Sequence, residues 1–212
     1  MKNLIACVVL LSGFVFIYRL LKGSALIRRQ KFIQGFIFPQ TIKKKIYEAY
    51  PHLTESEVNE VVRGLKEYFH LCNLAGKEFV SMPSQVVDLA WHEFILFTSL
   101  YRTFCNKAFG RFLHHVPAEA MRTPTIAQKG IKKAWRLSCR REKINPEIPI
   151  KLPILFAIDA KLKIANGFYY TLNCKGTDAT GFCASDIGGS CGGSGCGTHS
   201  DSGCSSGCGG GD

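Results

Sequence analysis

The sequence predicts an all-α fold with an N-terminal transmembrane helix, a small bundle of about four to five helices, and a disordered Gly/Cys-rich C-terminal tail. Three observations predict it: an uncharged apolar run near the start, helical spacing of apolar residues through the middle, and an abrupt change of composition late in the chain. The 212 residues, 46% hydrophobic and 20% charged, suit one globular domain with appendages. We therefore divide the chain into an anchor (1–22), a basic juxtamembrane linker (23–38), a helical domain (39–173) and a low-complexity tail (174–212).

The predicted anchor rests on a run of apolar residues from 4 to 21. Residues 4–18 carry no charge, and Arg19 is the one interruption before residue 21. A spanning helix needs about 20 apolar residues, whereas a secretory signal ends in a small-residue cleavage site. The residues that follow, Tyr18 to Lys22, supply no such site. We therefore prefer an uncleaved anchor that contacts the lipid bilayer through residues 4–21.

The charges that flank this run predict its orientation. Lys2 and the α-amine lie before it, whereas the residues that follow carry five positive charges, at Arg19, Lys22, Arg28, Arg29 and Lys31. The more positive flank stays in the cytoplasm. We therefore expect a single-pass inner (cytoplasmic) membrane protein with the bulk of the chain in the cytosol, where thiols stay reduced. The basic flank also suits anionic lipid headgroups.

The middle of the chain reads as successive helices. A first helix carries Ile42 and Ile46 on one face and ends by Pro51. A second begins at the capping box Thr54–Glu57 and keeps apolar residues at helical spacing as far as Cys72. Both patterns are typical of amphipathic helices that cover a core.

The run of residues 86–104 has apolar side chains on every side of the helix axis, which predicts one buried central helix ending near Gly110. Thr123 and Pro124 form an N-cap and first-turn pair, so the next helix extends to about Lys143. The prolines in 149–156 exclude an interior strand and lead into a short helix over about 155–164. No strand is predicted.

The tail differs from the body in composition and charge. Residues 174–212 hold six of the ten cysteines and 13 of the 21 glycines. Apart from Phe182 and Ile187 they offer almost nothing to bury, so we expect disorder unless the segment is cross-linked or binds metal. The tail carries −3 of the net +11, which leaves +14 on the anchor flank and body.

The candidate chemistry of the body centres on Asp88 and His92, which share a face of the predicted central helix. His114 and His115 follow the turn after that helix, while Cys105 falls on a different side. Carboxylate and imidazole donors suit zinc, iron or another transition metal. The alternative, which we prefer, is a structural polar network in which Asp88 orients His92 and a later histidine ties the loop to the helix. No catalytic residue is predicted.

Two further groups of residues are possible binding sites. The tail contains thiols and one imidazole at Cys191, Cys196, His199, Cys204 and Cys208. None has the spacing of a zinc knuckle, so low-complexity composition is preferred over loose binding of a soft metal or display of reactive thiols. Seven Lys and Arg residues lie in 129–143, and a solvated helix face explains them better than lipid headgroups. Nucleic acid is not expected, because no RNA-recognition motif accompanies them.

One stretch of the chain resembles a known family. The string VDLAWHEFILFT at 87–98 is followed by Tyr101, Phe104-Cys105, Phe109-Gly110 and the run 113–117, LHHVP. This pattern is similar to that of the bacterial glycine-rich domain-containing proteins, over roughly residues 40–212. The resemblance implies a helical domain with a glycine-rich C-terminus and no established activity. Larger plant relatives carry an RNA-recognition module that this chain lacks, so the resemblance implies no RNA role.

Three hypotheses of function follow. The first is a non-enzymatic, membrane-anchored interaction module that presents the Cys/Gly tail to an unidentified protein partner or handles metal. The second is a zinc or iron site in the body, built from Asp88, His92 and His114 or His115, with hydrolytic or redox activity. The third is a thiol redox sensor that works through the tail cysteines.

Overall fold

The computed structural model describes residues 2–116, 124–172, 182–184 and 187; for part of 2–22, and for 124–125, it describes the backbone alone. This part of the chain is mostly helical. It contains seven helices and one short strand pair: α1 (Lys2–Gly35), α2 (Gln40–Ala49), α3 (Glu55–Ala75), α4 (Gln85–Ile95), α5 (Thr98–Phe109), α6 (Pro124–Glu142), α7 (Ile154–Lys161), β1 (Tyr170–Thr171) and β2 (Phe182–Cys183).

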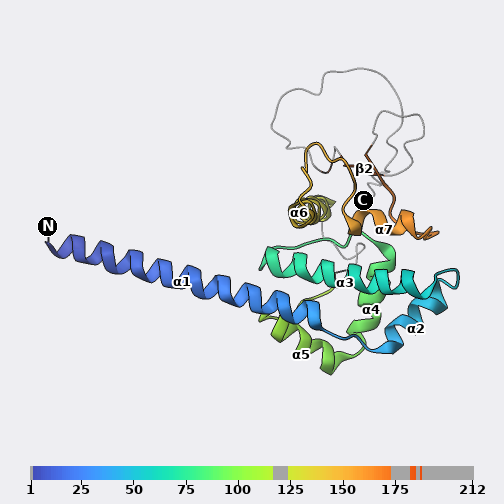
Figure 1. The fold of residues 1–212 in the computed structure, drawn as a ribbon, viewed down its shortest axis with the longest axis horizontal. Coiled ribbons are helices and arrows are strands. Elements are labelled where there is room, and N and C mark those ends of the chain that lie inside the picture. Colours follow the sequence, from blue (N-terminus) through green and yellow to red (C-terminus); the bar gives the residue numbers. More distant parts are fainter. Residues whose placement is uncertain (1, 117–123, 173–181, 185–186, 188–212) are drawn as a thin grey trace, which may run out of the picture.

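Helix α3 is the central element of the body. It contacts α1, α2, α4, α5, α6 and α7, and Figure 1 shows these helices arranged around it. The predicted capping box begins α3: the Thr54 side chain accepts from the backbone N–H of Glu57, and the Glu57 carboxylate accepts from the backbone N–H of Thr54. Gly64 lets α3 pack closely against α4, because a Cβ there would lie 2.9 Å from Val87 Cγ2.

Phenylalanine rings form the centre of the core between α1, α3, α4 and α5. Phe36 and Phe38, which directly follow α1, pack against Phe69, Phe94 and Phe104 with ring centroids 4.7–6.3 Å apart. Tilted and edge-on ring pairs of this kind contribute beyond the area they bury. The core therefore joins the end of α1 to the helices that carry the candidate site.

Helix α1 is where the structure departs most from the sequence prediction. In the part of the chain that the structure describes, no helix is long and apolar enough to cross a membrane. This contradicts the predicted span over 4–21, the transmembrane part of the fold class and the inner-membrane localisation. The helix continues unbroken to Gly35 through the predicted linker 23–38, and Ile33 near its end is fully buried in the body. An apolar run alone does not reveal how far a helix extends or what its later turns pack against.

The predicted central helix is in fact two helices. A turn at Leu96 and Phe97, with the Phe97 N–H donating to the Phe94 carbonyl, separates α4 from α5. Each shorter helix buries its own face, which explains why the combined run is apolar on all sides. Helix periodicity cannot detect such a break when both segments are apolar.

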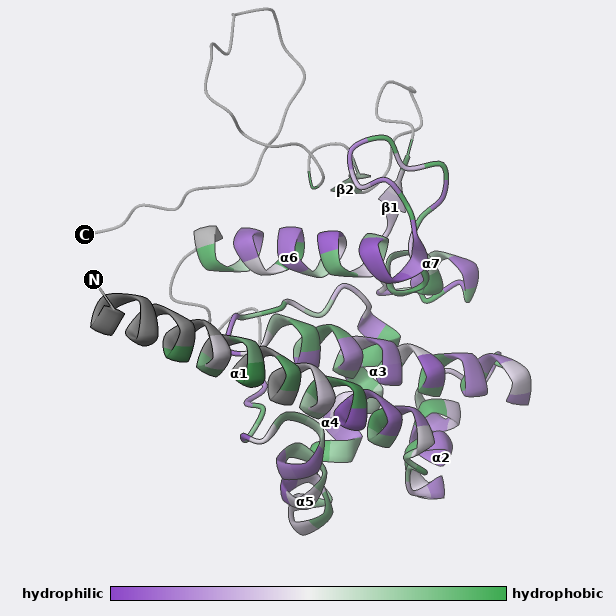
Figure 2. Cartoon of the chain, turned by 60° about the vertical axis from the view of Figure 1, so that its left-hand side comes forward, coloured by the Kyte–Doolittle hydropathy of each residue, from purple (hydrophilic) through white to green (hydrophobic). Residues whose placement is uncertain are grey.

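The outer elements complete the body. Helix α6 turns its hydrophobic side toward α3 and its hydrophilic side outward (Figure 2). Two of its basic residues form ion pairs with other elements, Lys133 with Glu78 at 2.6 Å and Arg141 with Glu67 at 2.8 Å. The one strand pair within the described residues, parallel β1 and β2, lies beside α7. Two residues per strand are too few to leave the alternating pattern that would have predicted them.

Candidate metal centre

Helix α4 holds the first two candidate ligands. It begins at Ser84, whose side-chain oxygen accepts from the Val87 N–H at 3.3 Å. Asp88 and His92 then follow one turn apart, and the His92 Nδ1 lies 3.7 Å from the Asp88 Oδ2. As the sequence predicts, the two side chains share a helix face.

The third side chain comes from the segment after α5. Gly110, at φ 69°, ends that helix in the left-handed conformation and reverses the chain. The Tyr101 hydroxyl then donates to the Leu113 carbonyl at 2.6 Å and accepts from Trp91 Nε1 at 3.1 Å. Burial raises the pKa of Tyr101, so its hydroxyl stays protonated as a donor. This chain of contacts fixes the segment that carries His115.

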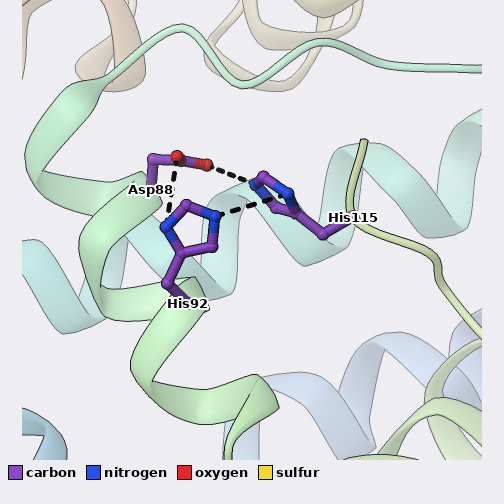
Figure 3. A group of neighbouring side chains, drawn as sticks. All are labelled: Asp88, His92 and His115. Carbon is purple, nitrogen blue, oxygen red and sulfur yellow. Dashed lines mark hydrogen bonds and ion pairs between the residues drawn. The ribbon is translucent and has the colours of Figure 1, made fainter. Parts of the chain in front are cut away.

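Asp88, His92 and His115 form a closed triangle (Figure 3). The His115 Nε2 lies 2.9 Å from the Asp88 Oδ1, and the His92 Nε2 lies 3.4 Å from the His115 Nδ1. One donor atom from each residue falls within 4.8 Å of the other two. The side chains of Asp88 and His115 are 20% and 12% exposed, whereas His92 is 49% exposed. The triangle is therefore anchored on its inner side and open at His92.

This arrangement supports two kinds of chemistry. In the first, the His115 ring hydrogen-bonds to the Asp88 carboxylate and to the His92 ring, and so ties the segment after α5 to α4. In the second, a single metal ion takes one donor from each residue, which gives a three-ligand site with an open coordination position. The Trp91 ring, 4.4 Å from the His115 ring between centroids, closes one side of the site.

A family model described as UCP032817-like matches residues 28–193. This chain belongs to the UCP032817-like family. The family is uncharacterised, and nothing in the match indicates a glycine-rich domain family, so the resemblance drawn from the WHEFILFT string is wrong. Comparison with curated proteins gave no match, and neither did comparison with solved structures.

His114 of this UCP032817-like protein does not join the triangle. Its ring packs edge-on against Phe112, with centroids 4.8 Å apart, and lines a hollow beside Tyr68. Neighbouring residues of an extended segment point to opposite sides, so only one histidine of the pair reaches Asp88. The sequence left the choice between His114 and His115 open.

The cysteines of the body take no part in the site. Cys72, Cys105 and Cys139 are free and buried. Burial raises the pKa of Cys72 to about 12 and that of Cys139 to about 11, so both stay neutral thiols. Cys183 is disulfide-bonded, contrary to the expectation of reduced thiols. The tail candidates Cys191, Cys196, His199, Cys204 and Cys208 lie outside the described residues.

Sequence reasoning missed the residue that supports the start of α4. Asp159, on α7, is 1% exposed and accepts from the Ser84 hydroxyl at 2.6 Å and from the Gln85 N–H at 2.7 Å. It also accepts from the Phe168 N–H at 2.8 Å. Asp159 lies more than 70 residues from the start of α4, so no local pattern links them. It therefore positions the helix that carries Asp88 and His92.

Proposed function

We propose that this UCP032817-like protein binds one divalent transition metal ion, zinc or iron, through Asp88, His92 and His115. The observation that carries the proposal is the convergence of three donor atoms within 4.8 Å. A carboxylate with two imidazoles suits zinc and iron(II), whereas magnesium prefers oxygen donors and copper(I) prefers sulfur.

The convergence of the three donors is compatible with a single shared ion. Donor atoms bound tetrahedrally to zinc lie about 3.4 Å apart, given zinc–ligand bonds of about 2.1 Å. In the structure, one donor atom from each of the three side chains lies within 4.8 Å of the other two. The three donors therefore have to move closer together than they lie in the structure when they bind a common ion, and the exposed His92 ring has room to move.

The surroundings of the triangle favour an open, reactive site. Tyr101 and Trp91 hold His115 in place, and Asp88 is fixed near the start of α4, so two ligands are pre-positioned. With three protein ligands, the fourth position faces solvent on the His92 side. A metal ion with a free position lowers the pKa of a bound water, which is the basis of hydrolytic chemistry.

Metal analysis of matched variants of the full-length protein tests the proposal. The wild type, His92→Ala and His114→Ala are loaded with Zn²⁺, dialysed and analysed for metal per chain. We expect His92→Ala to hold about one metal fewer than the wild type and His114→Ala to match it. Tail thiols contribute equally to all three proteins, so the difference reports the body site.

The result that contradicts the proposal is equal metal content in His92→Ala and His114→Ala. The triangle is then a hydrogen-bonded network that holds the segment after α5. Far-ultraviolet circular dichroism checks that each variant remains folded. We expect His92→Ala to fold, because the His92 side chain is half exposed.

A further inference from the structure

On the other side of the segment 113–116 from His115 lies a second site. Leu113, His114 and Val116 of that segment line a hollow of about 170 Å³ together with Tyr68 and Arg111. We propose that this hollow binds a small organic anion that has an apolar body and a single carboxylate. The proposal does not depend on the metal centre, because none of Asp88, His92 and His115 is among the residues that line the hollow.

The inner wall of the hollow is apolar and uncharged. Four of its lining residues are buried: Tyr68, Cys72, Val80 and Leu113. The Tyr68 hydroxyl already donates to the Val80 carbonyl at 2.9 Å. Burial raises the pKa of Cys72 to about 12, so its thiol carries no charge. This wall suits hydrocarbon.

The outer rim carries positive charge. Lys77 and Arg111 lie there. Glu78, the one acidic side chain among the described residues of the lining, pairs with Lys133 at 2.6 Å. Because Lys133 neutralises Glu78, Lys77 and Arg111 give the rim a net positive charge, which attracts an anion.

Arg111 is held ready for a ligand. Its Nε and Nη2 donate to the Gly76 carbonyl at 3.1 and 2.6 Å, and its Nη1 donates to the Phe112 carbonyl at 3.3 Å. A guanidinium has five N–H groups, so two have no partner among the residues the structure describes. A guanidinium fixed in this way loses little conformational entropy when it binds a carboxylate.

The size of the hollow selects a compact ligand. A cavity of about 150 Å³ accommodates benzene in another protein. A six-carbon ring therefore fits the apolar wall and leaves its carboxylate at the rim. Inorganic phosphate or acetate would meet the rim but leave the wall in contact with water.

Titrations of the full-length protein with three probes, followed by ligand-observed NMR, test the inference. Benzoate has both the ring and the charge, benzamide has the ring without the charge, and acetate has the charge without the ring. We expect saturable binding of benzoate and affinities about tenfold weaker or more for the other two. Equal binding of benzoate and benzamide, or no saturable binding of benzoate at millimolar concentration, would overturn the proposal.

Charge-matched variants locate the site. Lys77→Gln and Arg111→Gln should each weaken benzoate binding about tenfold, whereas Lys44→Gln, on α2, should leave it unchanged. An equal effect of Lys44→Gln would show a general surface charge effect and overturn the proposal. Lys77 is exposed, so its variant stays informative if Arg111→Gln unfolds. Binding should persist in His92→Ala, which separates this inference from the metal proposal.

Discussion

Asp159 should be the most sensitive polar position in the body. Its two carboxylate oxygens accept four hydrogen bonds: Oδ1 from the Ser84 hydroxyl and the Val86 N–H, and Oδ2 from the Gln85 and Phe168 N–H groups. The substitution Asp159→Asn keeps the shape but replaces one oxygen by an NH₂ group. In place of Oδ2, that NH₂ meets two N–H donors; in place of Oδ1, it meets the Val86 N–H and the Ser84 hydroxyl, which would have to turn from donor to acceptor.

The cost follows from the contacts that are lost. A hydrogen bond to a charged group contributes about 1.5–3 kcal/mol, and a buried donor left without a partner adds a desolvation penalty. The negative charge at the start of α4 also interacts favourably with the helix dipole. Two lost bonds at a side chain that is 1% exposed therefore predict a destabilisation of about 3–5 kcal/mol.

Urea unfolding, followed by far-ultraviolet circular dichroism in the presence of a chelator, measures this loss. The matched control is Asp88→Asn, the same substitution at a partly exposed carboxylate one turn into α4. It should lower the free energy of unfolding by about 1 kcal/mol or less. Equal losses for the two variants, or a loss under about 1 kcal/mol for Asp159→Asn, would refute the reasoning.

Three other predictions concern packing, pH and metal. Gly64→Ala should destabilise the fold by about 1–3 kcal/mol in urea unfolding, because its Cβ would lie 2.9 Å from Val87 Cγ2, whereas Gly35→Ala, with no atom within 4 Å, should not. Burial lowers the pKa of His70 from 6.5 to about 4, so only the unfolded chain takes up this proton between those values and stability falls as the pH drops through that window. With allowance for solvent screening, His70→Gln should remove about 1–2 kcal/mol of this pH dependence, and equal slopes for both proteins would refute it. Zn²⁺ affinity of the wild type, measured by competition with a chelating dye, should decrease as the pH is lowered, because protons compete for the imidazoles. An affinity that does not change with pH would count against the centre.

Local patterns predicted the features that depend on a few neighbouring residues. The capping box at Thr54, the start of α6 at Pro124 and the shared face of Asp88 and His92 all follow from helix geometry within one or two turns. The same patterns failed where the outcome depends on packing. They joined α4 and α5 into one helix and predicted a membrane span for the apolar run at the start of α1, which the structure contradicts.

The sequence by itself determined the helical character of the body and two of the three donors of the candidate centre. Only the tertiary structure decided that His115, and not His114, completes that centre, because the direction of a side chain in an extended segment depends on what holds the backbone. Here Tyr101 and Trp91 hold it. The same holds for Asp159, whose contacts with α4 exist only once α7 packs against that helix. Contacts between distant segments depend on the packing of the whole core, and no short-range pattern in the sequence encodes them.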